Sequence, residues 1–396
     1  MSAAGPSPVG AGAAIFELLA RDGSARRGRL TTAHGVVETP CFMPVGTLGA
    51  VKGLGPQQLE EAGATVMLAN LYHLALRPGI ETIERVGGLH RFCGWSRTLA
   101  TDSGGFQVFS LSDRRSVDDD GVEFKSHLDG STVRLTPESV VEMQERIGVD
   151  LAMVLDECPP WPVTEAAAES ALDRTLTWAR RSRERHRGGP TALFGIVQGS
   201  TYPRLRQRAI EELEPLDFDG YAIGGVAVGE GAAASRDVVG RFAAALPDHK
   251  PRYLMGLGTP EDILHGVRCG VDLFDCVLPA RNARHGLLYT RAGLLRIRNA
   301  VFRDDDRPLD PDCACPACLR VSRALVHHLI RSGEITGQVL ATLHNVRFFL
   351  DFMGDLRQAV ASGSLRAATA CSGSVNGSVT QPSERSPVLT QRRSDR

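Results

Sequence analysis

Three carboxylates stand directly after apolar segments of this sequence. Asp102 follows TLAT, Asp156 follows AMVL, and Asp275 follows a run that ends in LF. Side chains at such places can be nucleophiles or general acids and bases, but polar residues also end buried strands without any further role. If the three acids converge, they repel each other unless a metal ion, a cationic substrate or unequal pKa values relieve the repulsion. These side chains are the first candidates for chemistry.

A cysteine cluster, CACPAC, indicates a second kind of site. Cys313, Cys315 and Cys318 lie within six residues, a spacing that suits thiolate ligation of one tetrahedral metal ion better than disulfide bonds. The fourth ligand must come from elsewhere, and three downstream histidines are candidates: His327, His328 and His344. Because four protein ligands leave no position for water, a zinc ion bound here would be structural.

A third feature is a basic segment that begins beside Asp275. From residue 276 to residue 303 there is no Asp or Glu, but there are six arginines: Arg281, Arg284, Arg291, Arg296, Arg298 and Arg303. Guanidinium groups suit contacts to phosphates and bases. The first two arginines follow Asp275 within nine residues and are the stronger candidates, whereas the distal ones fit a solvated basic surface equally well. With a net charge of −1 for the whole chain, a polyanion would have to bind such a local patch.

The elements that must position these residues are short apolar runs, each of which stops at a polar or glycine residue. Seven are clear: TVMLAN (65–70), TLATDSGG (98–105), DLAMVLDE (150–157), ALFGIVQG (192–199), GYAIGG (220–225), RYLMGLG (252–258) and VDLFDC (271–276). Segments with helical spacing separate most of them, among them 136–148 and 164–187, which begin at capping threonines. Continuous apolar strands alternating with helices predict an α/β TIM barrel rather than an open doubly wound sheet, since no dinucleotide or P-loop motif is present.

In such a barrel the strand ends converge on one mouth. We therefore expect a set of polar and glycine residues to meet there: Asn70, Asp102, Asp156, Gln198, Gly224, Gly225, Met255 and Asp275.

The composition of the chain limits the class of protein and the compartment to which it can belong. The chain has 396 residues, of which 42% are hydrophobic and 23% charged, values typical of globular proteins. Neither a membrane span nor a secretory signal is visible, and the nine cysteines include the cluster, so we expect a reduced, cytoplasmic compartment. Residues 1–14 are predicted to be a disordered leader, 15–366 the catalytic barrel domain, and the Ser/Arg-rich residues 367–396 a disordered tail.

Seven motifs in sequence order carry a family resemblance: DSGGFQVFSL (102–111), DECPP (156–160), FGIVQG (194–199), IGGVAVGE (223–230), YLMGLGTPED (253–262), DLFDCVLPARNARHG (272–286) and CACPACLR (313–320). From about residue 15 to about residue 365 the sequence resembles the bacterial tRNA-guanine transglycosylases, or queuine tRNA-ribosyltransferases. The resemblance implies a TIM barrel with a zinc-binding insertion, here at about 300–350, and a homodimer. It also implies His344 as the fourth ligand of one structural Zn²⁺.

The resemblance further implies a reaction. Guanine at the wobble position of GUN-anticodon tRNAs (for Asp, Asn, His and Tyr) would be exchanged for 7-aminomethyl-7-deazaguanine, preQ1, a free deazaguanine base. Asp275 would be the nucleophile that forms a covalent ribosyl intermediate, and Asp102 the general acid and base. Arg281 and Arg284 would hold the anticodon loop.

The same resemblance implies which residues recognise the base. Asp156 would accept from the N1–H and amino group of guanine, while the Gln198 side chain and the Gly225 backbone N–H would donate to O6. Four further residues would complete the base site by stacking or polar contacts: Ser103, Phe106, Val226 and Met255. Val228 stands where eukaryotic-type enzymes tend to have glycine, which favours preQ1 over the larger queuine. The Val226 carbonyl and Glu230 could serve the preQ1 ammonium group.

Two other interpretations remain open on the sequence. A zinc-stapled tRNA-binding subunit without activity would share the fold and the arginines, but such proteins tend to lose the acids or the guanine-reading residues, which are present here. An archaeal-type transglycosylase that acts elsewhere on tRNA would carry additional C-terminal RNA-binding domains, whereas here only a short tail follows the motifs.

Overall fold

The centre of the molecule is a barrel of eight parallel strands. The computed structural model describes residues 14–111 and 115–365. In chain order the strands are β4 (Cys41–Pro44), β5 (Val66–Asn70), β6 (Thr98–Asp102), β10 (Leu151–Met153), β11 (Ala192–Val197), β12 (Gly220–Ile223), β13 (Arg252–Leu254) and β14 (Leu273–Cys276). From β5 onward each strand pairs with the next, β14 pairs with β4, and an isolated parallel bridge between Val45 and Leu68 joins β4 to β5. The predicted TIM-barrel fold is confirmed.

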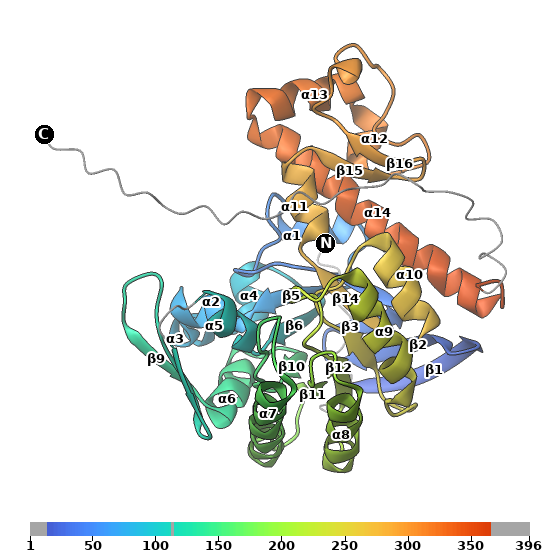
Figure 1. The fold of residues 1–396 in the computed structure, drawn as a ribbon. Helices are drawn as coiled ribbons and strands as arrows, with labels where there is room; N and C mark the ends of the chain where they lie inside the picture. The colour runs from blue at the N-terminus through green and yellow to red at the C-terminus, as the bar shows by residue number, and fades with distance from the viewer. Residues whose placement is uncertain (1–13, 112–114, 366–396) are drawn as a thin grey trace, which may run out of the picture.

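Helices surround the barrel and connect its strands (Figure 1). They are α1 (Pro56–Glu61), α2 (Leu71–Leu76), α3 (Ile80–Arg85), α4 (Leu89–Cys93), α5 (Gly105–Leu111), α6 (Pro137–Ile147), α7 (Glu165–Arg185), α8 (Pro203–Leu213), α9 (Ala232–Phe242) and α10 (Pro260–Arg268). The two helices with the clearest sequence signals begin as predicted, because the side chains of Thr136 and Thr164 cap α6 and α7. Gly148 ends α6 with a left-handed φ of 71°.

Two antiparallel sheets are added to the barrel. The strands β1 (Ile15–Asp22), β2 (Ala25–Thr32) and β3 (Gly35–Thr39) contact its N-terminal end, where Thr32 hydrogen-bonds Thr98 at the start of β6. A second sheet of β7 (Arg115–Asp118), β8 (Gly121–Lys125) and β9 (Thr132–Leu135) is inserted between β6 and β10. Neither sheet is predicted by the sequence patterns described above.

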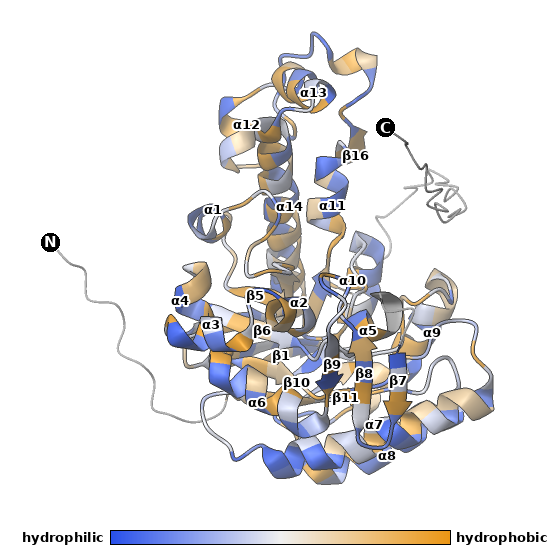
Figure 2. Cartoon of the chain, turned by 90° about the vertical axis from the view of Figure 1, so that its left-hand side faces the viewer, coloured by the Kyte–Doolittle hydropathy of each residue, from blue (hydrophilic) through white to orange (hydrophobic). Residues whose placement is uncertain are grey.

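The segment after β14 forms a separate lobe, drawn in orange at the top of Figure 1. It contains α11 (Leu278–Arg284), β15 (Leu287–Thr290), β16 (Gly293–Arg296), a 3-10 turn η3 (Ala300–Phe302), α12 (Pro316–Arg320) and α13 (Arg323–Ser332). Eleven buried residues between Ala283 and Ala341 give this lobe a small core of its own. The long helix α14 (Ile335–Ala361) runs from the lobe to the barrel in both views (Figures 1 and 2), and its Phe349 and Met353 belong to the barrel core.

Within the described residues, no helix is both long enough and apolar enough to cross a membrane. Apart from Ala14, the leader predicted over residues 1–14 and the tail predicted over residues 367–396 lie outside the described residues. The 3-10 turns η1 (Glu214–Leu216) and η2 (Ala243–Ala245) follow α8 and α9.

Candidate active site and metal centre

The C-terminal ends of the barrel strands enclose a cavity of about 460 Å³. All eight residues expected at the barrel mouth line it: Asn70, Asp102, Asp156, Gln198, Gly224, Gly225, Met255 and Asp275. Ser103, Phe106 and Val226, which the family resemblance implies, line it as well. The structure thus brings three carboxylates from β6, β14 and the segment after β10 into one cavity.

Asp275 is the third residue of β14 and has an asymmetric environment. The Tyr253 hydroxyl donates to its Oδ1 at 2.7 Å, and the Gly256 N–H donates to the same oxygen at 2.8 Å. No described residue donates to Oδ2. Burial raises the pKa of Asp275, and the two hydrogen bonds oppose that rise. One carboxylate oxygen is held in place, and the other keeps its lone pairs available to a substrate in the cavity.

Asp102 ends β6 and is held by neutral donors. The Leu71 N–H donates to Oδ1 at 3.1 Å, and the Asn70 and Gln107 amides donate to Oδ2 at 2.5 and 3.3 Å. The Asn70 amide is oriented by the local fold, because its oxygen caps α2 by accepting from the His73 N–H. Burial, together with the charge of Asp275, raises the pKa of Asp102 to about 7. A carboxyl group with this pKa can both give and take a proton at neutral pH.

Asp156 follows β10 and faces two side-chain donors. Ser103 Oγ donates to Oδ1 at 3.2 Å, and Gln198 Nε2 donates to Oδ2 at 2.7 Å. Burial raises the pKa of Asp156 to about 6, although these hydrogen bonds oppose the rise. The Gln198 Oε1 atom is buried and has no hydrogen-bond partner among the described residues. The close fit requires Gly105, where an added Cβ would lie 2.6 Å from the Asp156 carbonyl oxygen.

The loop after β12 forms another wall of the cavity. Gly225 has a φ of +64°, and a Cβ there would lie 2.2 Å from Gln198 Oε1, so only glycine fits. Val228 also lines the cavity. The Glu230 carboxylate accepts from the backbone N–H groups of Ala227 and Val228 at 2.6 and 2.9 Å. Here Glu230 therefore stabilises the loop and is not among the cavity-lining residues.

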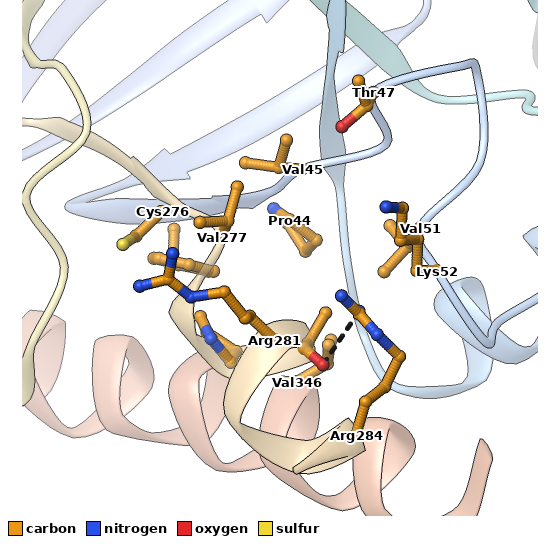
Figure 3. A pocket seen from close by; sticks show the side chains of 13 residues that line it. Pro44, Val45, Thr47, Val51, Lys52, Cys276, Val277, Arg281, Arg284 and Val346 are labelled. Atoms are coloured by element: carbon orange, nitrogen blue, oxygen red, sulfur yellow. Dashed lines mark hydrogen bonds between the residues drawn. The ribbon is translucent and has the colours of Figure 1, made fainter. Parts of the chain in front are cut away.

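A smaller cleft of about 190 Å³ adjoins the cavity and shares Arg281 with it. Arg281 and Arg284 extend from α11 toward opposite ends of this cleft (Figure 3). Arg284 Nη1 donates to the Ala280 carbonyl at 2.9 Å. Lys52, from the loop after β4, lines the same cleft. This cation was not predicted, and no feature of its surrounding sequence distinguishes it from an ordinary surface lysine.

The four predicted metal ligands come together in the C-terminal lobe. One donor atom from each of Cys313, Cys315, Cys318 and His344 lies within 4.8 Å of the others. His344 Nδ1 is 3.3 Å from Cys318 Sγ, while His344 Nε2 is 2.8 Å from the Tyr289 carbonyl oxygen. A proton on Nε2 is thus used by that carbonyl, which leaves Nδ1 free to bind a metal ion. The donor set fits a tetrahedral Cys₃His site.

The other two histidine candidates lie on α13 and are not in the cluster. His327 is buried, and its Nδ1 is 2.7 Å from the Ile297 carbonyl oxygen. Among the alternatives that the spacing left open, the structure therefore places His344 beside the thiols.

The opposite, N-terminal end of the barrel has a buried carboxylate of a different kind. Asp150, just before β10, lies 2.9 Å from His34 Nδ1 and 3.2 Å from His90 Nε2, and it accepts from the Leu99 N–H at 2.8 Å. The two imidazole rings stack at 3.6 Å. Burial alone would raise the pKa of Asp150, but the hydrogen bonds from the histidines and Leu99 outweigh it and lower the pKa to about 2.

Tyr253 is the site residue that the sequence interpretation missed most clearly. It lies inside an apolar run and reads as a core aromatic residue. A signal does exist, because Tyr253 and Met255 are two residues apart and therefore face the same side of a strand. Both line the cavity.

Comparisons with known proteins agree with one another. The sequence pattern of a family described as queuine tRNA-ribosyltransferase matches residues 22–371. The chain is 51% identical over 352 residues to a queuine tRNA-ribosyltransferase of Thioalkalivibrio sulfidiphilus, covering 89% of this chain and 95% of that protein. It is 51% identical over 350 residues to one of Marinobacter nauticus, covering 88% and 94%. Thiobacillus denitrificans has another that is 51% identical over 345 residues, covering 87% and 94%.

Proposed function

Because the chain belongs to the queuine tRNA-ribosyltransferase family, we propose that it is a glycosyltransferase that exchanges guanine in tRNA for preQ1 at the barrel mouth. The exchange takes place at the wobble position of tRNAs with a GUN anticodon, those for Asp, Asn, His and Tyr. The observation that carries this proposal is that the three carboxylates of one cavity differ in their hydrogen-bond partners and in their pKa values. Asp275 has a free oxygen, Asp102 has a pKa of about 7, and Asp156 faces side-chain hydrogen-bond donors.

In the first displacement, Asp275 Oδ2 attacks C1′ of the target nucleotide. The bond from C1′ to guanine N9 breaks with its electron pair on the base, and a protonated Asp102 supplies the proton that guanine needs to leave. A covalent ribosyl-aspartate remains. In the second displacement, the incoming base attacks C1′ from the opposite face, Asp102 removes its proton, and the bond to Asp275 breaks. Two inversions restore the original configuration.

Guanine binding uses groups that hold one another in the ligand-free site. When the N1–H and amino group of guanine donate to Asp156, they replace the donors Ser103 and Gln198. The freed Gln198 amide can then donate to O6, together with the Gly225 N–H. Phe106 and Met255 contact the two faces of the ring. Adenine is rejected because it would leave these buried polar groups unpaired.

The arginine cleft beside the cavity suits the anticodon loop. Arg281, Arg284 and Lys52 together form a cationic surface that adjoins the nucleophile. A wobble nucleotide has to be turned out of its loop for C1′ to reach Asp275, and a single-stranded loop lowers the cost of doing so. We assign the loop bases that flank the target to Arg281 and Arg284 and the phosphates to the wider cationic surface.

The test uses GUN-anticodon tRNA that carries labelled guanine at the wobble position. Addition of preQ1 should release the label. If neither preQ1 nor queuine releases it, the enzyme proposal is wrong and the inactive tRNA-binding subunit becomes the better interpretation. An equally labelled tRNA with a non-GUN anticodon is the control and should keep its label.

Val228 makes the choice between the two bases testable. Its branched side chain lines the cavity and would occupy the space that the cyclopentenediol of queuine needs. We expect Val228→Gly to gain exchange with queuine while exchange with preQ1 continues. Wild-type protein that uses queuine but not preQ1 would refute this assignment. Val226→Ala is the matched control, because it shortens a neighbouring branched residue on the same loop.

For the Cys₃His cluster we propose one structural Zn²⁺. Four protein ligands leave no position for a water molecule, so the ion would contribute folding energy and no chemistry. Removal of the ion should expose the C-terminal lobe to protease while the barrel stays resistant. Cys315→Ser should reproduce this cleavage and lose the metal, whereas Cys269→Ser, at a free cysteine outside the cluster, should do neither. An intact lobe after verified metal loss would contradict the assignment.

Two properties that accompany the family resemblance are also proposals. We expect a homodimer, which light scattering on the purified protein would measure as twice the chain mass. The free thiols suit a reducing, cytoplasmic compartment, and fractionation of the source cells would test that location.

A further inference from the structure

Arg206 is a fully buried arginine whose role the proposed reaction does not explain. It lies in the first part of α8, and its side chain is 0% exposed. All three of its hydrogen bonds within the described residues go to backbone carbonyl oxygens: Ser200 at 2.7 Å, Val197 at 2.8 Å and Gly225 at 3.1 Å. A buried guanidinium that pairs only with carbonyl dipoles is expensive to desolvate. Burial lowers its pKa to about 10, so it stays charged at neutral pH.

The three carbonyls belong to the two segments that present donors to the base. Val197 and Ser200 flank the Gln198 segment at the end of β11, and Gly225 lies in the loop after β12. A single guanidinium therefore ties the backbone of one O6 donor to the backbone of the other. The packing around this link is tight, because a Cβ on Gly225 would lie 3.2 Å from Arg206 Nη2 and one on Gly199 would lie 2.9 Å from the Arg206 backbone N.

The link also limits how the two segments can move. The Gly224 N–H donates to the Val197 carbonyl at 3.1 Å, the same oxygen that accepts from Arg206 Nη1. A planar guanidinium can meet three carbonyls in three fixed directions, which a lysine ammonium on a flexible stem cannot do with the same precision of placement. Since α8 anchors the side chain, the distance between Gln198 and Gly225 is set by a rigid element.

We propose that Arg206 is a positioning residue that sets the recognition of the 6-oxo group of the base. The inference rests on the proposed function. Arg206 does not contact the base. It holds Gln198 and the Gly225 N–H at the separation that one purine O6 requires, so it determines how strongly the enzyme prefers a 6-oxopurine to a purine without that oxygen.

Arg206→Lys and Arg206→Met test this role. The readout is the ratio of the inhibition constants of 2-aminopurine and guanine, because 2-aminopurine keeps the 2-amino group and lacks O6. Loss of the link should weaken guanine binding roughly tenfold to a hundredfold, raise KM for guanine with little change in kcat, and leave 2-aminopurine binding nearly unchanged. The inhibition constant of 2-aminopurine divided by that of guanine should therefore fall toward one. The fall should be smaller in Arg206→Lys than in Arg206→Met.

Arg252→Lys is the matched control. Arg252 is 1% exposed and begins β13 at the opposite end of the barrel, where it contacts Asp248 at 2.8 Å. The same substitution there should lower stability and leave the ratio of inhibition constants unchanged. An unchanged ratio in the Arg206 variants, or an equal fall in Arg252→Lys, would overturn the proposal. Wild-type protein that exchanges no guanine would instead contradict the proposed function.

Nitrogen NMR of the wild-type protein gives a second measurement that does not depend on the folding of a variant. Guanine binding should shift the guanidinium resonances of Arg206, because Gly225 and Gln198 take up the ligand, while those of Arg252 stay in place. Saturating guanine that shifts neither arginine, or both equally, would contradict the assignment.

Discussion

Asp102 ends β6 and Asp150 directly precedes the neighbouring strand β10, so the two lie at opposite ends of the barrel, and they have opposite electrostatic environments. Asp102 is half-buried and Asp150 is buried, and each accepts a hydrogen bond from a backbone N–H, that of Leu71 and that of Leu99 respectively. Their side-chain partners differ. Asp102 is held by the neutral amides of Asn70 and Gln107, whereas two imidazoles surround Asp150.

The pKa values follow from these partners. Burial raises the pKa of Asp102 to about 7, because the amides supply no positive charge and Asp275 lies in the same cavity. At Asp150 the histidines reverse the effect of burial and lower the pKa to about 2. One barrel therefore holds the same residue type with a pKa suited to proton transfer at its mouth and with a pKa that keeps it charged at neutral pH at its base.

The largest expected contrast is in activity. Asp102→Asn should lower guanine exchange roughly 10²- to 10⁴-fold, the usual contribution of a general acid or base. Asp150→Asn should leave turnover per folded molecule nearly unchanged, because the side chain does not reach the cavity. Single-turnover release of labelled guanine measures both. Equal losses in the two variants would show that the two ends are not functionally distinct.

For stability the order of the two variants should be reversed, with Asp150→Asn the damaging substitution. Asp150→Asn removes the charge that His34 and His90 face, so the free energy of unfolding should fall by about 1–3 kcal/mol. Asp102→Asn removes a carboxylate whose ionisation burial opposes, so at pH 8 the free energy of unfolding should rise by about 1–4 kcal/mol. The upper end corresponds to the full rise of the pKa, from 3.8 to about 7, and the lower end allows for the hydrogen bonds that the carboxylate accepts. Urea unfolding of both variants beside the wild type tests this, and stabilisation by Asp150→Asn would contradict it.

The pH dependence sharpens the same comparison. The pKa of Asp150 is lowered, so its stabilisation is complete above the unfolded value of about 3.9 and is lost as the pH falls toward 2. The pKa of Asp102 is raised, so it costs stability progressively as the pH rises from about 4 to about 7. Asp150→Asn should therefore remove the loss of stability that begins below about pH 3.9. Asp102→Asn should remove the loss of stability between about pH 4 and about pH 7. A profile that Asp102→Asn leaves unchanged between pH 4 and 7 would argue against the raised pKa.

The smallest effect is expected at His34. Its side chain is 40% exposed, and the hydrogen bond to Asp150 raises its pKa. The stabilisation is present below the unfolded value of about 6.5 and is lost as the pH rises through the folded pKa. Because solvent screens an exposed pair, His34→Ala should cost about 0.5 kcal/mol or less at pH 6 and still less at pH 8. A cost that grows with pH would have the wrong sign.

The sequence predicted the mouth of the barrel better than its base. Apolar runs that end in polar residues mark Asp102, Asp156 and Asp275 directly, because parallel strands place their C-terminal ends together. Asp150 begins a run, and its partners His34 and His90 are separated from it by more than fifty residues. No periodicity connects such residues, so their contact was not predictable.

Other omissions have equally local causes. β4 (Cys41–Pro44) is only four residues long and ends at a proline, so it was not recognised as the eighth strand. Tyr253 and Arg206 were overlooked because an aromatic residue in an apolar run and an arginine in a polar helix look ordinary in sequence. Their partners, Asp275 and the Gly225 carbonyl, come from other elements of the fold.

The central claim is that Asp275 carries the ribose between the two bases. Wild-type protein mixed with GUN-anticodon tRNA in the absence of free base should form an adduct that survives denaturant. Mass spectrometry after nuclease and protease digestion should place a ribosyl fragment on the peptide that contains Asp275, and Asp275→Asn should form no adduct. An adduct on another residue, or one that persists in Asp275→Asn, would contradict the account.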